Sequence, residues 1–222
     1  MKVTDNLCAY IWRNMQANNC NSFVVRTPKT TCLIDPGHRA FLPQLFRSMR
    51  EDGFAPEEVK LVVLTHGHPD HLEGGLEFRK MGAHLAIHRA EEAYLKEIGP
   101  YFARMLGVEM PQLVFDLYLE EGELFIGEER FQVIHSPGHS PGSICLHWEA
   151  PGVLFSGDLV FAQGVGRTDF PGGDGELLKE SIRRCRPLGA HMLMPGHGEA
   201  ILTPSGVERN FEIIEKMYFD YL

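Results

Sequence analysis

Three histidines and one aspartate stand within residues 65–71, Thr-His-Gly-His-Pro-Asp-His. They are His66, His68, Asp70 and His71. The preceding residues 60–64, Lys-Leu-Val-Val-Leu, are apolar and β-branched, which is typical of a short buried strand. Imidazoles and a carboxylate at the end of a strand form a ligand set that suits zinc, iron or manganese. The segment therefore predicts a metal site, with a polar strand-to-helix turn as the alternative.

Three further polar residues also follow predicted strands. His139 comes after the strand at 130–135, Asp158 after 153–155, and His197 after 192–194, and glycines flank each of them. Glycine lets the backbone turn sharply and approach a metal closely. A single Gly-His pair is weak evidence, but the repeated placement at strand ends indicates one shared site.

The elements that must position these residues alternate along the chain. Short apolar or β-branched runs predict strands, and Asn18-Asn19 is read as a turn between the first two. The strands are expected at 7–12, 22–26, 31–34, 60–64, 83–88, 123–126, 130–135, 143–148, 153–155 and 192–194. Helices are expected at 41–49, 73–80, 89–107 (broken at Gly99-Pro100), 176–186 and from Thr203-Pro204 onward. We expect one α+β domain, residues 1–222, with two packed sheets and helices outside.

Composition excludes several classes of protein. The net charge of −9 argues against a nucleic-acid surface. No apolar run reaches membrane-spanning length, and the first residues lack the regions of a signal peptide. The five cysteines are scattered, which fits reduced thiols. We expect a cytoplasmic protein with a small-molecule substrate, and the aromatic tail at 217–222 leaves a homodimer open.

The ordered set His66-x-His68-x-Asp70-His71, His139, Asp158 and His197 resembles the metallo-β-lactamase fold superfamily over nearly the whole chain. The resemblance implies an αββα four-layer sandwich with its site at the sheet edges. It implies one metal on His66, His68 and His139, a second on Asp70, His71 and His197, and Asp158 bridging both. One departure is Glu73, which stands where the family often has glycine; we expect it to be a first-turn helix acid.

Two divalent metals imply hydrolysis. Metals about 3.5–4 Å apart can share a hydroxide and polarise a carbonyl, and they lower the pKa of bound water to about 7. Zinc is the expected metal, with iron and manganese as alternatives. Asp70 is placed to orient the water or carry a proton if one metal is bound. Asp35 either holds a ligand histidine by its second ring nitrogen or only forms an Asp-Pro-Gly turn.

Residues 164–173 resemble the Gly-Arg-Thr-Asp-Phe segment of glyoxalase II-like hydrolases and persulfide dioxygenases, both of which act on sulfur-bearing substrates. Arg167 is accordingly a candidate for substrate binding, while an ion pair with Asp169 that braces the loop is the alternative. The C-terminal helical domain that holds glutathione in glyoxalase II is not visible here.

The sequence thus predicts a binuclear metal-dependent hydrolase of thioesters or related esters, similar to hydroxyacylglutathione hydrolases. The alternative is a mononuclear iron persulfide dioxygenase using His66, His139 and Asp158, since such iron sites need two histidines and one carboxylate. A lactonase is less favoured. A nonenzymatic scaffold would require the loss of a ligand, and none is lost.

Overall fold

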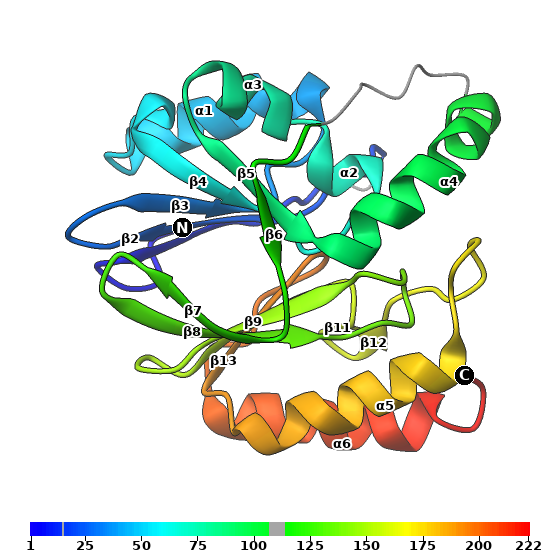
Figure 1. Cartoon of the computed structure of the whole chain (residues 1–222). Coiled ribbons are helices and arrows are strands. Elements are labelled where there is room, and N and C mark those ends of the chain that lie inside the picture. Colours follow the sequence, from blue (N-terminus) through cyan, green and yellow to red (C-terminus); the bar gives the residue numbers. More distant parts are fainter. Residues whose placement is uncertain (15, 107–113) are drawn as a thin grey trace.

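The computed structural model describes residues 1–14, 16–106 and 114–222, with the side chains of 102, 103, 105 and 106 also excluded. Four layers are stacked in it: helices, a first sheet, a second sheet, and helices again (Figure 1). The predicted αββα sandwich is confirmed. In the part of the chain described, no helix combines the length and apolar character needed to cross a membrane.

The first sheet has six strands in the spatial order β1-β2-β3-β4-β5-β6. The first three strands pair antiparallel and the rest pair parallel. Four α-helices and two 3-10 helices accompany this sheet. The elements are β1 (Leu7–Tyr10), β2 (Ser22–Arg26), β3 (Thr31–Ile34), β4 (Val59–Val63), β5 (His84–His88), β6 (Leu117–Leu119), η1 (Arg39–Phe41), α1 (Leu42–Glu51), η2 (Pro56–Glu58), α2 (Pro69–Leu72), α3 (Gly75–Lys80) and α4 (Arg89–Leu106).

The second sheet has five strands in the order β13-β10-β9-β8-β7, and only the β10–β13 pair is parallel. Helices α5 and α6 cover its outer face (Figure 1). The elements are β7 (Gly122–Ile126), β8 (Glu129–His135), β9 (Ile144–Trp148), β10 (Val153–Gly157), the hairpin β11 (Val160–Phe161) and β12 (Gly164–Val165), α5 (Gly175–Cys185), η3 (Arg186–Leu188), β13 (Met192–Pro195) and α6 (Pro204–Tyr218).

Three apolar clusters hold the layers together, one between the sheets and one beneath each helical layer. Between the sheets, the rings of Phe23 and Phe155 lie 5.5 Å apart. Because helices or a second sheet cover both faces, a strand such as β10 is buried at every residue. This explains why the strands read as short continuous apolar runs in the sequence.

Two helical predictions need correction. The helix expected at 73–80 begins only at Gly75, as α3, and the separate short helix α2 before it was not predicted. Gly74 lies between the two, where a Cβ would come within 2.9 Å of the Gly37 carbonyl oxygen. The break expected at Gly99-Pro100 is absent, since α4 continues through Pro100. Pro100 lies on the exposed side, where water can bind the carbonyl that loses its helical partner. The expected end of this helix at 107 lies outside the described residues.

Candidate metal centre

The turn after β4 gathers four buried polar side chains. His68 is the N-cap of α2, and Pro69 at the first helical position starts the helix with its fixed φ. His66, His68, Asp70 and His71 are each less than 8 % exposed. Side chains of this polarity are buried at a cost unless they find partners or a cation. The local sequence therefore builds a dense group of nitrogen and oxygen donors at the edge of the first sheet.

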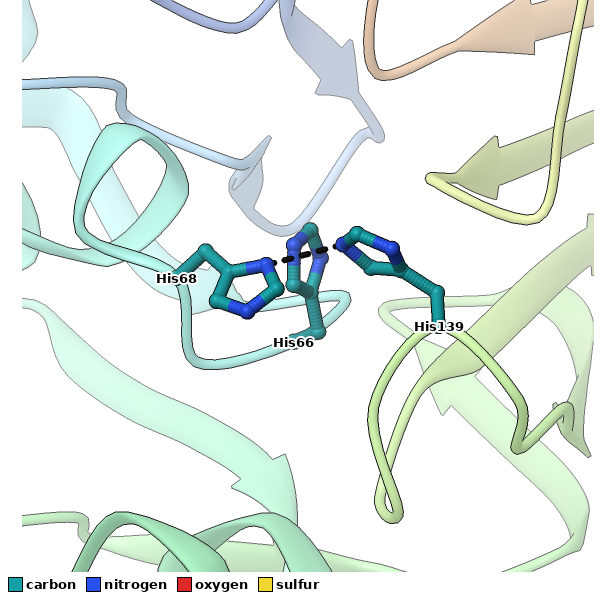
Figure 2. A group of neighbouring side chains, drawn as sticks. All are labelled: His66, His68 and His139. Atoms are coloured by element: carbon teal, nitrogen blue, oxygen red, sulfur yellow. Dashed lines mark hydrogen bonds between the residues drawn. The ribbon is translucent and has the colours of Figure 1, made fainter. Parts of the chain in front are cut away.

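His139 completes one group from the opposite sheet. Figure 2 shows the rings of His66 and His68 converging with that of His139, which follows β8. The His68 Nδ1 atom lies 2.8 Å from His139 Nε2, and the His66 ring centre is 4.8 Å from each of the other two. One nitrogen from each ring falls within 4.8 Å of the others. This trio is the first ligand set implied by the sequence.

Asp70, His71 and His197 form a second group, which β13 completes. His197 Nε2 lies 3.3 Å from His71 Nε2 and 3.3 Å from Asp70 Oδ2. Donors bound to one tetrahedral metal at its usual bond lengths stand about 3.3 Å apart. The spacing in this group therefore suits a single cation.

Asp158, directly after β10, stands between the two groups. Its Oδ1 is 3.3 Å from His71 Nε2, while its Oδ2 is 3.4 Å from His197 Nε2 and 3.5 Å from His139 Nε2. The carboxylate thus faces a histidine of the first group and two of the second. All seven residues predicted as ligands are brought together.

The second ring nitrogens show which atoms remain for a metal. His66 Nδ1 donates to Thr65 Oγ, His71 Nδ1 to Asp35, and His139 Nδ1 to the Arg167 carbonyl. Each ring therefore turns Nε2 toward the centre. In the described residues His66 Nε2 is buried without a hydrogen-bond partner, which costs about 1–3 kcal/mol. A metal would satisfy this atom, so the donor set fits one.

Histidines of the two groups differ in the direction of their pKa shifts. Burial lowers the pKa of His68 to about 3 and also lowers that of His66. Burial alone would lower the pKa of His71 too, but Asp158 and Asp35 outweigh it and raise that pKa. Asp158 likewise outweighs burial at His197 and raises its pKa to about 9. Protons held on His71 and His197 are the ones that a cation must replace.

The two carboxylates respond in the opposite sense. Burial would raise the pKa of Asp158, but His71 and His197 outweigh it and hold the pKa well below its usual range. At Asp70 burial would also raise the pKa, but the hydrogen bond from His197 together with the charges of His71 and His197 outweighs it and lowers the pKa. Both acids therefore stay ionised at neutral pH and can serve as ligands.

Asp35 satisfies both readings left open by the sequence. Its carboxylate accepts hydrogen bonds from Thr65 N at 2.8 Å, Thr65 Oγ at 2.7 Å and His71 Nδ1 at 2.8 Å. It also begins the turn, with a left-handed φ of +52°. Such backbone is costly for a residue other than glycine and collects at functional sites. The turn aims the carboxylate at His71.

Two asparagines were missed as parts of the site. Asn18 Nδ2 donates to Asp70 Oδ2 at 2.7 Å. Asn21 Nδ2 donates to the carbonyls of Pro195 and Gly198, on either side of His197. In the sequence Asn18 reads as a turn residue, and its partner is 52 positions away. No local signal could have found these contacts.

A cavity of about 460 Å³ opens over the centre. Phe170 stands edge-on to His68 and Phe161 edge-on to His197, each at a ring distance of 5.7 Å. The polar floor is thus flanked by aromatic walls. The lining comprises Asn18, His38, His68, Pro69, Asp70, His139, Asp158, Phe161, Arg167, Phe170 and His197.

Arg167 lines this cavity but already has a partner. Its guanidinium makes two hydrogen bonds to Asp169, at 2.8 and 2.7 Å, and lies 4.1 Å from the centre of the Phe170 ring. Both members of the ion pair are more than 60 % exposed. The structure therefore contains the bracing pair, while the contact of Arg167 with substrate stays a prediction.

Comparison with known proteins agrees with this geometry. The sequence profile of the metallo-beta-lactamase superfamily matches residues 15–197. The chain is 33 % identical to hydroxyacylglutathione hydrolase GloC of Haemophilus influenzae over 81 % of this chain and 85 % of that protein. It is 31 % identical to the probable metallo-hydrolase YqgX of Bacillus subtilis over 84 % and 90 %. Among solved structures, TTHA1623 in a di-iron-bound form is similar, with a TM-score of 0.72 and 30 % identity over 86 % and 93 %.

Proposed function

The chain belongs to the metallo-beta-lactamase superfamily, and we propose that it is a binuclear hydrolase of thioesters or related esters, of the hydroxyacylglutathione hydrolase kind. The observation that carries this proposal is the position of Asp158, whose two oxygens face both donor groups. A carboxylate that faces both donor groups suits two metals close enough together to act on one carbonyl. The similarity to GloC supports the thioester class.

The seven clustered side chains have separate roles in this proposal. His66, His68 and His139 would hold one metal, Asp70, His71 and His197 would hold the other, and Asp158 would be shared between them. Divalent metals bound there, zinc in the first instance, would make a nucleophile available from water at neutral pH and would polarise the carbonyl. The di-iron form of TTHA1623 makes iron the main alternative to zinc.

The protein's own groups handle water and protons. Asp70 stays ionised, and the amide of Asn18 holds one of its oxygens at 2.7 Å. From the cavity wall Asp70 can orient a water molecule or accept its proton when one metal is bound. Phe161 and Phe170 keep part of the cavity apolar, and Arg167 binds an anionic end of the substrate at the rim.

The test combines metal content with a substrate panel. Protein purified without added metal is assayed for zinc, iron and manganese, and then for hydrolysis of glutathione thioesters, other thioesters and matched oxyesters. About two metals per chain with thioester hydrolysis is the expected result. Two bound metals without hydrolysis of any thioester would contradict the substrate class while leaving the metal centre intact.

A persulfide dioxygenase is the second candidate, because three of the clustered side chains are two histidines and one carboxylate. The sequence predicted His66, His139 and Asp158 for this role. The trio of that composition grouped in the described residues is instead His66, His71 and Asp158, with ligand atoms within 4.8 Å of one another. Two histidines and one carboxylate are the ligand set of non-haem iron oxygenases. Oxygen uptake by ferrous protein given glutathione persulfide, without thioester hydrolysis, would favour this candidate.

We also propose that the protein is located in the cytoplasm. The five cysteines are all buried free thiols, which fits the reducing cytoplasm. Fractionation of cells expressing the full chain tests it, and recovery outside the cytoplasmic fraction would contradict it.

A further inference from the structure

Glu91, near the start of α4, joins two loops of the metal centre from beneath. The residue is 0 % exposed. Its Oε1 accepts a hydrogen bond from Gly67 N at 2.7 Å, and its Oε2 accepts from Ser140 Oγ at 2.9 Å and Gly142 N at 2.7 Å. Gly67 separates His66 from His68, while Ser140 follows His139 directly. One carboxylate thus connects the backbone segments that carry all three histidines of the first group.

We propose that Glu91 is a positioning residue that sets the distance between the His66–His68 turn and the His139 loop, and so determines how tightly the first metal is held. An ionised carboxylate only accepts hydrogen bonds, which matches the three donors that face it. Charge-assisted bonds of this kind are shorter and stronger than neutral ones. Because burying a carboxylate is costly, an apolar side chain would serve better if the position only filled space.

The packing around Glu91 agrees with this role. A Cβ on Gly142 would lie 2.2 Å from the Glu91 backbone nitrogen, and a Cβ on Gly67 would lie 2.8 Å from Leu95. Both loops therefore rest directly on the first turns of α4. The N-terminal end of this 18-residue helix also favours an acidic side chain.

Helix α4 also contacts the loop that contains Arg167 and Pro171. Tyr94 Oη donates to the Pro171 carbonyl at 2.6 Å. Pro171 belongs to the loop whose Arg167 carbonyl holds His139 Nδ1. Helix α4 thus contacts both the loop that carries His139 and the loop whose carbonyl accepts from its ring, and Glu91 bonds the residues next to the ligands.

This inference rests on the metal centre of the proposed function and not on its substrate. The test therefore measures metal binding in the absence of substrate. Glu91→Gln keeps the size of the side chain but puts an NH₂ donor where one of the N–H or O–H donors now points. Glu92→Gln is the matched control, because Glu92 lies in the same helical turn and bonds Tyr118 and Lys96 instead.

Metal-free proteins are titrated with Zn²⁺ against a chelator and with Co²⁺ by visible absorption, after circular dichroism has shown that each is folded. Glu91→Gln is expected to weaken the binding of one of the two zinc ions, the one assigned to His66, His68 and His139, by about tenfold or more and to change the Co²⁺ spectrum, while Glu92→Gln matches the wild type. Folded Glu91→Gln with wild-type affinity and spectrum would overturn the proposal.

A second variant decides the matter if Glu91→Gln does not fold. Ser140→Ala removes one of the three hydrogen bonds and leaves the carboxylate with its two backbone donors. It is expected to weaken zinc binding by a smaller factor than Glu91→Gln, with the metal-free protein still folded. Unchanged zinc affinity in Ser140→Ala, combined with failure of Glu91→Gln to fold, would reduce Glu91 to a structural residue and overturn the proposal. Loss of thioester hydrolysis alone bears only on the proposed function.

Discussion

The Asp35 carboxylate lies 2.8 Å from Nδ1 of His71, and both side chains are at most 1 % exposed. The pair links the end of β3 to α2 beneath the centre. Asp35 raises the pKa of His71 together with Asp158. It also fixes the ring so that Nε2 faces Asp158 and His197.

Asp35→Asn is expected to weaken metal binding by about 10- to 100-fold, as is typical when a partner of a ligand histidine is lost. Asparagine tolerates the left-handed backbone at this position, so the variant tests the charge and not the turn. Chelator competition gives the affinity, and the exposed Asp5→Asn serves as control. An affinity equal to that of the wild type would mean that Asp35 only forms the turn.

Asp158→Ala is expected to lower the metal content to one ion per chain or fewer and to abolish hydrolysis, because both donor groups lose their shared carboxylate. The fold should survive, since the three apolar clusters do not include this residue. Elemental analysis and circular dichroism measure the two effects. Full metal content with full activity would defeat the assignment of the site.

Metal affinity is expected to rise as the pH increases from about 6.5 to 9, because a cation must displace the proton from His197, whose pKa is raised to about 9. Zinc affinity at a series of pH values, with His197→Ala as comparison, measures this. Affinity independent of pH in the wild type would contradict the raised pKa.

The contribution of His197 to the stability of the metal-free protein should fall as the pH rises, whereas metal affinity rises. A pKa raised on folding contributes stability that is complete below the unfolded value of about 6.5. That contribution is lost as the pH rises through about 9. Thermal unfolding of metal-free wild type and His197→Ala, compared across this range, isolates the contribution.

Arg167→Ala is expected to raise KM with little change in kcat if Arg167 binds the substrate. The exposed pair with Asp169 is worth only about 0–1 kcal/mol, so stability should hardly change. Asp169→Ala provides the contrast, since it breaks the pair but keeps the guanidinium. Equal kinetic effects of the two variants would favour the bracing pair over substrate binding.

Several elements were predictable because their causes are local. The strands at 22–26 and 31–34 follow from β-branched apolar runs between turns. The last helix begins at Thr203-Pro204 as expected, with the Thr203 side chain capping Gly206 N. The continuation of α4 through Pro100 was not predictable, because it depends on which side of the helix faces solvent.

The sequence by itself determined the types of the donors and their placement after strands, because residue chemistry and the strand-to-turn transition act over a few residues. Only the tertiary structure decided which groups hold them. Asn18 meets Asp70 and Glu91 meets Gly142 across 52 and 51 positions, and Asn21 meets Gly198 across 177. These contacts depend on how the two sheets and α4 pack against one another. Burial of apolar surface drives that packing. The polar residues that it brings together therefore show no local pattern in the sequence.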